Sequence, residues 1–177
     1  MFKLKNKIQS ASFYTLGCKL NFSESSFIMD DLINNGYKIN DFSEISDLYI
    51  INTCSVTENA NKKCRKIIRQ VKKRSPDSKV VIIGCYAQLK PFEISLIPGV
   101  DLVLGAKEKF NILKYIPSID KNLEKVHSCE IDSVKDFIST YSTSQRKRSF
   151  LKIQDGCNYP CTYCTIPLAR GRSRSDT

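Results

Sequence analysis

Short apolar runs alternate with amphipathic segments from about residue 9 to residue 116, and this alternation limits the possible folds more than any other feature. The apolar runs predict buried strands at 11–17, 47–53, 79–84 and 100–105, with a further short strand at 37–42. The amphipathic segments predict helices at 21–35, 56–74 and near 107–116. Strands that are separated by helices pair in parallel, so the sequence predicts an α/β fold built on a parallel sheet.

The helix predicted at 56–74 has the clearest apolar stripe. Its apolar residues recur at steps of three or four, which places them on one face of a helix that can cover the sheet: Val56, Ala60, Cys64, Ile67 and Val71.

Positive charge is concentrated in two segments of the chain. Residues 62–74 carry eight Lys or Arg and no acid, and residues 146–174 carry seven Lys or Arg against Asp155. The net charge of +10 is therefore a local feature. Such clusters attract phosphate backbones and bind them with release of counterions, although a basic run is equally compatible with a solvated helix face and a basic loop.

The length of 177 residues and the hydrophobic content of 41% suit one sizeable domain and part of another. No apolar run approaches the roughly 20 residues of a membrane span. Residues 1–5 lead into polar sequence without the features of a signal peptide. We therefore expect a soluble, cytoplasmic protein that does not interact with membranes, in which eight cysteines serve metal or redox chemistry.

Three cysteines follow three of the predicted strands. Cys18, Cys54 and Cys85 each come directly after an apolar run, and the carboxyl ends of parallel strands share one edge of a sheet. Helix N-termini at that edge favour the thiolate form that a metal needs. The pattern predicts a three-thiolate site, although any one of these cysteines could simply be a small buried residue.

A second set of three cysteines is close together in sequence. Cys157, Cys161 and Cys164 are separated by three and then two residues, a spacing that can ligate three irons of one cubane cluster. The fourth iron is left open to a ligand. A structural zinc site is the alternative, but it takes four protein ligands, and the only histidine, His127, lies well upstream.

The remaining cysteines and the histidine are not assigned to a site. Cys64 belongs to the apolar stripe and is expected to pack in the core. Cys129 has no partner at metal-ligand spacing. We expect His127 to be a surface residue rather than a catalytic base, because nothing nearby in the sequence would orient it.

The cysteine loop, with Gly156, Pro160 and Tyr163 around it, resembles that of radical S-adenosylmethionine enzymes. With both cysteine sets placed, the chain resembles the methylthiotransferase family of that superfamily from about residue 13 to residue 175. The motifs that carry this resemblance are Thr-Leu-Gly-Cys-Lys-Leu-Asn at 15–21, Asn-Thr-Cys-Ser-Val-Thr at 52–57, Gly-Cys-Tyr-Ala-Gln at 84–88, the loop from Gln154, and Arg-Gly-Arg-Ser-Arg at 170–174.

The resemblance implies two [4Fe-4S] clusters and S-adenosylmethionine as cofactors. Cys18, Cys54 and Cys85 would hold an auxiliary cluster, and Cys157, Cys161 and Cys164 would hold the cluster that binds S-adenosylmethionine. Tyr163 would lie near the adenine. Radical chemistry would remove a hydrogen from the substrate before a methylthio group is installed, and no catalytic side chain is assigned beyond the clusters.

Three substrates occur in the family that the chain resembles: isopentenyladenosine in tRNA, threonylcarbamoyladenosine in tRNA, and an aspartate of a ribosomal protein. The segments 16–21 and 169–174 most resemble the threonylcarbamoyladenosine branch, which acts on carbon 2 of adenosine 37. The implied partners are tRNA, an electron donor protein and a sulfur donor. A non-enzymatic module, either a zinc-stabilised RNA binder or a cluster-bearing electron carrier, is the alternative class.

We predict three parts along the chain: an amino-terminal methylthiotransferase domain at 1–116, a linker with one short strand or helix at 117–147, and the start of a radical S-adenosylmethionine α/β barrel at 148–177. Residues 150–153 would form the first barrel strand and deliver the cysteine loop at its carboxyl end. A barrel needs about 200 residues, so we expect a truncated barrel and an inactive fragment.

Overall fold

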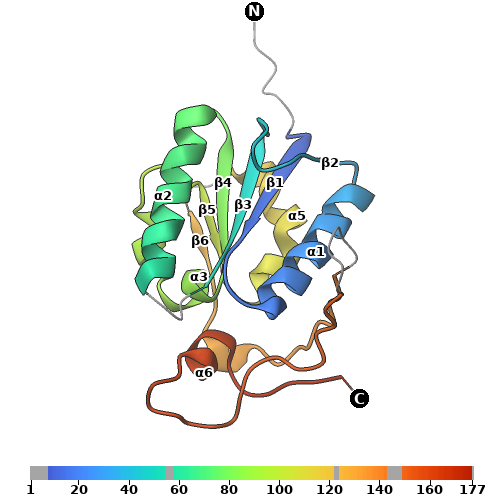
Figure 1. Cartoon of the computed structure of the whole chain (residues 1–177), viewed down its shortest axis with the longest axis vertical. Helices are drawn as coiled ribbons and strands as arrows, with labels where there is room; N and C mark the ends of the chain where they lie inside the picture. The colour runs from blue at the N-terminus through green and yellow to red at the C-terminus, as the bar shows by residue number, and fades with distance from the viewer. Residues whose placement is uncertain (1–7, 55–57, 122–123, 143–148, 177) are drawn as a thin grey trace, which may run out of the picture.

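The computed structural model describes residues 8–54, 58–121, 124–142 and 149–176. Six parallel strands form one sheet in the order β2-β1-β3-β4-β5-β6, which confirms the predicted parallel α/β fold (Figure 1). The strands are β1 (Ser10–Thr15), β2 (Lys38–Ile39), β3 (Leu48–Thr53), β4 (Lys79–Gly84), β5 (Leu102–Leu104) and β6 (Val126–His127).

Helices cover both faces of this sheet. In Figure 1, α2 stands against one face and α1 and α5 against the other. The helices are α1 (Lys19–Asn34), α2 (Glu58–Arg74), α3 (Cys85–Leu89), α4 (Pro91–Ser95), α5 (Ile112–Tyr115) and α6 (Ile166–Arg170), with 3₁₀ helices η1 (Glu108–Asn111), η2 (Ile116–Ser118) and η3 (Ile131–Ser133). None of the described helices is long and apolar enough to span a membrane.

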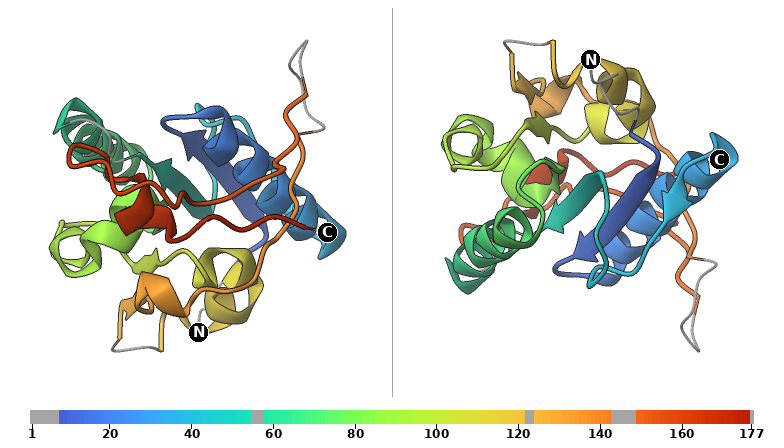
Figure 2. Two further views of the ribbon diagram at one scale, coloured as in Figure 1. Left: turned by 90° about the horizontal axis from the view of Figure 1, so that it is seen from below. Right: turned by 90° about the horizontal axis from the view of Figure 1, so that it is seen from above.

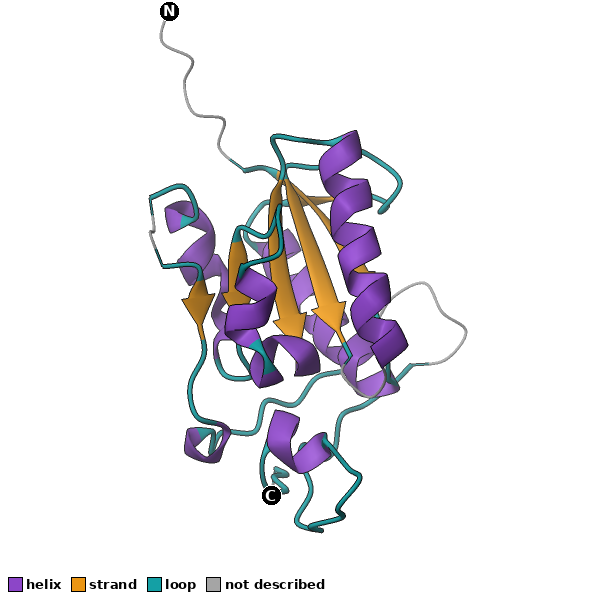
Figure 3. Cartoon of the chain, turned by 90° about the vertical axis from the view of Figure 1, so that its left-hand side faces the viewer, coloured by secondary structure: helices purple, strands orange, loops and turns teal. Residues whose placement is uncertain are grey.

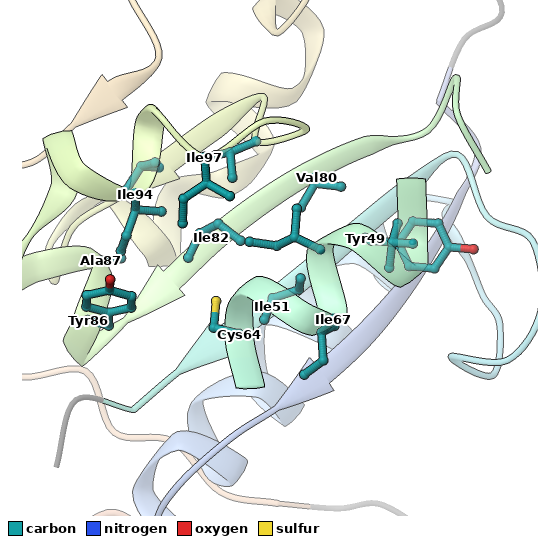
Figure 4. Close-up of a cluster of buried hydrophobic side chains, with 14 of the residues drawn as sticks. Tyr49, Ile51, Cys64, Ile67, Val80, Ile82, Tyr86, Ala87, Ile94 and Ile97 are labelled. Carbon is teal, nitrogen blue, oxygen red and sulfur yellow. The ribbon is translucent and has the colours of Figure 1, made fainter. Parts of the chain in front are cut away.

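The two faces of the sheet build two hydrophobic cores, because successive side chains of a strand point to opposite sides. On β3, Tyr49 and Ile51 pack toward Cys64 and Ile67 of α2, as the close-up in Figure 4 shows. Leu48 and Ile50 of the same strand join the core under α1 and α5. A strand that is buried on both faces explains why 47–53 reads as a continuous apolar run.

The carboxyl ends of the strands all face the carboxy-terminal part of the chain. Figure 3 shows the arrowheads pointing toward α6, and Figure 2, from below, shows α6 and the segment around it lying across the strand ends. The residues that follow β1, β3 and β4 are therefore gathered at the edge of the sheet that faces this segment.

Several predicted helices and strands differ from the structure at their ends. The helix predicted at 56–74 is observed from Glu58, and residues 55–57 lie outside the described part. The helix predicted near 107–116 is split into η1, α5 and the start of η2. Within the predicted linker, β6 adds a short edge strand to the sheet.

The prediction of a strand at 150–153 is wrong. Only an isolated antiparallel bridge forms there, between Tyr141 and Leu151. Leu151 and Ile153 are exposed, whereas Lys152 between them is buried. The ammonium group of Lys152 is buried against Glu24 and Asp155, so ion pairing rather than apolar burial decides which side of the segment faces inward.

Candidate metal centre

Cys18, Cys54 and Cys85 lie on three neighbouring loops at the carboxyl edge of the sheet. Cys18 is the N-cap of α1, Cys54 directly follows β3, and Cys85 is the first residue of α3. Cys18 is exposed, whereas Cys54 and Cys85 are half-buried, and none of the three forms a disulfide. The prediction that they follow the carboxyl ends of parallel strands is confirmed, and the structure shows that these strands, β1, β3 and β4, are neighbours in the sheet.

Two glycines let these loops approach each other closely. Gly17 has φ +100°, and a Cβ there would lie 2.6 Å from Cys54 Cβ and 2.9 Å from Cys54 Sγ. Gly84 has φ +96°, and a Cβ there would overlap the backbone of Thr53. Both positions combine a backbone conformation that favours glycine with space for nothing larger. The loops that carry the three cysteines therefore pack directly against one another.

Asn21 joins two of the three loops through its side chain. Its Nδ2 donates to Leu16 O at 2.8 Å and to Thr53 O at 3.0 Å, just before Cys18 and Cys54 respectively. Both bonds are buried. A buried amide that satisfies two backbone carbonyls fixes the spacing between the loops.

A buried ion cluster lies beside these loops. We use this name for Glu24, Lys109, Lys152, Asp155 and Arg170. The Glu24 carboxylate is fully buried and pairs with the nitrogens of Lys109 at 2.7 Å, Arg170 at 3.0 Å and Lys152 at 3.3 Å. Asp155 pairs with Arg170 at 2.8 Å and with Lys152 at 3.1 Å.

The cluster keeps Glu24 ionised. Burial alone would raise the pKa of this carboxyl, but Lys109, Arg170 and Lys152 together hold it far below its usual value. Burial lowers the pKa of Lys109, and its ion pair with Glu24 opposes that shift. With all five groups ionised, three cations face two carboxylates, which leaves one excess positive charge. Arg174, 3.7 Å from Asp155, adds a further cation at its rim.

The excess charge lies next to Cys85. Cys85, Lys109, Asp155 and Arg170 line one small cavity of about 10 Å³. Burial raises the pKa of the Cys85 thiol, while the charges of Arg170 and Lys109 oppose that rise. A thiolate at Cys85 would neutralise the surplus positive charge, which is the chemistry that a metal–thiolate site requires.

The second cysteine set lies on a loop that is fastened at its beginning. Gly156 has φ +75°, and a Cβ there would overlap the backbone of Gly171 and Arg172. Cys157 N donates to Gly171 O at 3.0 Å, and Cys164 N donates to Cys161 O at 3.1 Å, which closes a turn within the set. This loop is therefore held against the residues that follow α6.

An open pocket of about 630 Å³ lies beside this loop. Cys157, Asn158 and Tyr159 form one side, and Leu168 and Arg172 are among the residues of the other. Cys161 is exposed and Cys164 half-buried, while Tyr163 is 89% exposed.

Each cysteine set supplies three free thiols, which fits a three-thiolate iron–sulfur cluster in kind and number. Within the described part of the chain, however, no three His, Cys, Asp or Glu side chains are arranged to hold a metal ion. The assignment of the six cysteines as ligands therefore stays a prediction.

The structure also places the three residues to which no site is assigned, Cys64, Cys129 and His127. Cys64 is fully buried in the core, as predicted, and burial raises the pKa of its thiol to about 12. Cys129 is half-buried, and its carbonyl accepts a hydrogen bond from Gln88. His127 differs from the surface position expected for it: it is half-buried in β6, with its ring 4.6 Å from that of Tyr115.

The buried ion cluster is the part of the site that sequence reasoning missed. Its members come from distant positions, and Glu24 pairs with residues 85, 128 and 146 positions away. One local signal was the polar run at 23–26, which includes Glu24 and lies on a predicted helix. The structure buries all four of these residues. A buried polar run in a helix indicates partners elsewhere in the chain.

Comparison with known proteins gives relatives along almost the whole chain. The Bacillus subtilis (strain 168) protein named "Threonylcarbamoyladenosine tRNA methylthiotransferase MtaB" is 39% identical over 169 residues, 94% of this chain and 38% of that protein. The Aquifex aeolicus protein of the same name is also 39% identical, over 93% of this chain and 41% of that protein.

A relative with a different printed substrate is also found. The Dictyoglomus thermophilum protein named "tRNA-2-methylthio-N(6)-dimethylallyladenosine synthase" is 36% identical over 91% of this chain and 38% of that protein. The chain thus spans about two fifths of the length of the curated relatives that it matches.

One family model covers five of the six strands and the three loops described above. It is described as "Uncharacterized protein family UPF0004" and matches residues 10–105, from the first strand to just past β5. This match contains Cys18, Cys54 and Cys85, together with Gly17 and Gly84. The chain therefore belongs to the UPF0004 family, and it resembles the tRNA methylthiotransferases.

Proposed function

We propose that this chain belongs to a tRNA methylthiotransferase that installs a methylthio group at carbon 2 of threonylcarbamoyladenosine 37 by radical S-adenosylmethionine chemistry. One observation carries the proposal: the loops of Cys18, Cys54 and Cys85 meet at the edge of the sheet across which the segment with Cys157, Cys161 and Cys164 lies. The relatives named threonylcarbamoyladenosine methylthiotransferases support the substrate.

The two cysteine sets have separate tasks in this proposal. Cys18, Cys54 and Cys85 would hold an auxiliary [4Fe-4S] cluster, and Cys157, Cys161 and Cys164 a second one with an iron left open for S-adenosylmethionine. When bound, these cofactors supply the radical chemistry and the sulfur that no side chain can supply. Tyr163, on the exposed loop, would pack near the adenine.

The protein around the sites holds the loops in place. Gly17 and Gly84 allow the first three cysteine loops to approach one another, and Asn21 fixes two of them. Burial raises the pKa of the Cys85 thiol, and the positive charges of Arg170 and Lys109 oppose that rise. We further propose that the protein works in the cytoplasm with an electron donor protein and a sulfur donor.

The isopentenyladenosine branch is the second candidate, because relatives with "dimethylallyladenosine" in their printed names are also similar to this chain, at 31% to 36% identity. Their identity over similar lengths is slightly below that of the Bacillus and Aquifex proteins, which favours threonylcarbamoyladenosine.

Disruption of the gene that encodes this chain tests the substrate. Nucleosides from total tRNA of the disrupted and parent strains are compared by mass spectrometry. We expect the methylthio form of threonylcarbamoyladenosine to disappear and its unmodified form to accumulate. Loss of the methylthio group from isopentenyladenosine instead would support the second candidate. If the tRNA nucleosides are unchanged and a ribosomal protein instead loses the methylthio group on an aspartate, both tRNA candidates are contradicted. If neither the tRNA nor the ribosomal protein changes, a non-enzymatic role is favoured.

A further inference from the structure

Arg170 contacts both parts of the candidate site. From α6, its guanidinium donates to Glu24 Oε1 at 3.0 Å and to Asp155 Oδ1 at 2.8 Å through Nη1. Through Nη2 it donates to Glu24 Oε2 at 3.2 Å and to Asn21 Oδ1 at 2.6 Å. All four bonds are buried.

On the sheet side, Arg170 reaches all three cysteine loops. Its partner Asn21 bonds the carbonyls that precede Gly17 and Cys54, and Arg170 itself lines the small cavity next to Cys85. Asn21 therefore links the Arg170 guanidinium to the loops of Cys18 and Cys54, and the guanidinium itself lies beside Cys85.

On the other side, Arg170 is joined to the second cysteine loop. Asp155, which it binds, comes two residues before Cys157 and pairs through its backbone with Arg174 at 2.9 Å and 2.8 Å. Gly171, which directly follows Arg170, accepts a hydrogen bond from Cys157 N. The contacts thus run without interruption from one cysteine set to the other.

We propose that Arg170 is a positioning residue that fixes the second cysteine loop relative to the first three and places a positive charge at Cys85. The geometry requires the planar fork of an arginine. A lysine ammonium can neutralise a carboxylate, but it cannot reach two carboxylates and the Asn21 amide in these directions at once. The positional part of this inference stands on protein contacts alone, whereas the part concerning a cluster rests on the proposed function.

Hydrogen–deuterium exchange on the cluster-free chain tests the positional part. Arg170→Gln should speed amide exchange at residues 153–176 by about tenfold or more, because charged hydrogen bonds that close this segment are lost. Arg170→Lys should exchange like Arg170→Gln. Lys152→Gln is the matched control: it removes a buried cation from the same cluster but no bond to Asn21 or contact with Cys85, and should have a smaller effect.

Amide exchange in these three variants, with α2 as the internal reference, can contradict the inference in two ways. Equal effects of Arg170→Gln and Lys152→Gln, or wild-type exchange in Arg170→Lys, would overturn the inference. Exchange in α2 should stay unchanged in every variant that remains folded. If Arg170→Gln does not fold, Asn21→Ser breaks the same contact from the sheet side. It should then loosen residues 153–176 too, and unchanged exchange there would be equally decisive against the inference.

A reduction potential tests the electrostatic part. In a reconstituted background with Cys157, Cys161 and Cys164 replaced by Ala, Arg170→Gln should shift the potential of the remaining cluster to more negative values. The reason is that a nearby positive charge favours the reduced form. The shift should exceed that of Lys152→Gln, and an equal or opposite shift would refute it. If no cluster assembles in this background, the proposed function fails, while the exchange results still decide the positional part.

Discussion

At the scale of single residues, the site depends on positions where only one side chain satisfies the geometry. Gly17 is the clearest case, since it combines a positive φ with direct contact to Cys54. The motif around Cys18 showed that a glycine precedes the cysteine. It could not show which neighbour presses against it, because that contact forms only when β1 and β3 pair.

We predict that Gly17→Ala destabilises the chain more than Gly36→Ala. Both glycines have positive φ, but a Cβ at Gly36 meets nothing within 4 Å, whereas one at Gly17 overlaps Cys54. Gly36→Ala should cost about 1–2 kcal/mol for the backbone alone, and Gly17→Ala about 1–3 kcal/mol more from forced displacement of Cys54. Urea denaturation measures both, and equal losses would show that the Cys18 and Cys54 loops do not touch.

Glu24→Gln is predicted to lower the free energy of unfolding by about 3–5 kcal/mol, because it leaves buried cations without their shared carboxylate. Glu130→Gln, on an exposed side chain, is the control. The pKa of Glu24 is lowered on folding, so its contribution is present above the usual glutamate pKa of about 4.3 and is lost as pH falls below that value.

Wild-type stability should therefore fall more steeply than that of Glu24→Gln between about pH 5 and pH 3. Denaturant unfolding at a series of pH values gives both slopes. Parallel slopes would mean that Glu24 is not the carboxylate that titrates on acid unfolding.

At the scale of helices and strands, the sequence predicts well wherever apolar burial decides the structure. The strands β1, β3 and β4 and the helix α2 were expected close to their observed bounds, because each buries an apolar run or stripe. Residues 150–153 do not form the predicted strand, for the opposite reason. Their buried member is Lys152, whose partner Glu24 is 128 residues away, and no local pattern reveals such a pair.

The exposed face of α2 is predicted to bind the phosphate backbone of tRNA. Lys62, Arg65, Lys66, Arg69, Gln70 and Lys73 line a groove of about 360 Å³ on this helix. Replacing Lys66, Arg69 and Lys73 together by Glu should weaken tRNA binding. It should also reduce the slope of log Kd against log salt by about two to three, since each phosphate contact contributes about 0.7–0.9.

The matched control reverses three other exposed lysines, Lys38, Lys107 and Lys114, and changes the net charge by the same amount. Fluorescence anisotropy with labelled tRNA at several salt concentrations measures both variants. If the two triple variants weaken binding equally, overall charge accounts for the effect and α2 has no special role.

At the scale of the whole molecule, one sheet edge brings together residues from nearly the full length of the described chain. The fold class and the common edge of Cys18, Cys54 and Cys85 could be predicted from sequence, because parallel topology fixes where strands end. The contact of that edge with Arg170 could not be predicted, since it depends on how the segment after residue 149 packs.

The central claim is that two independent cysteine sets each hold a cluster, and the most direct test is to count iron and sulfide after anaerobic reconstitution. The wild-type chain is compared with two variants, one with Cys18, Cys54 and Cys85 replaced by Ala and one with Cys157, Cys161 and Cys164 replaced. We predict about eight irons for the wild type and about four for each variant. About four irons in the wild type, zinc in place of iron, or loss of all iron in either variant would contradict the claim.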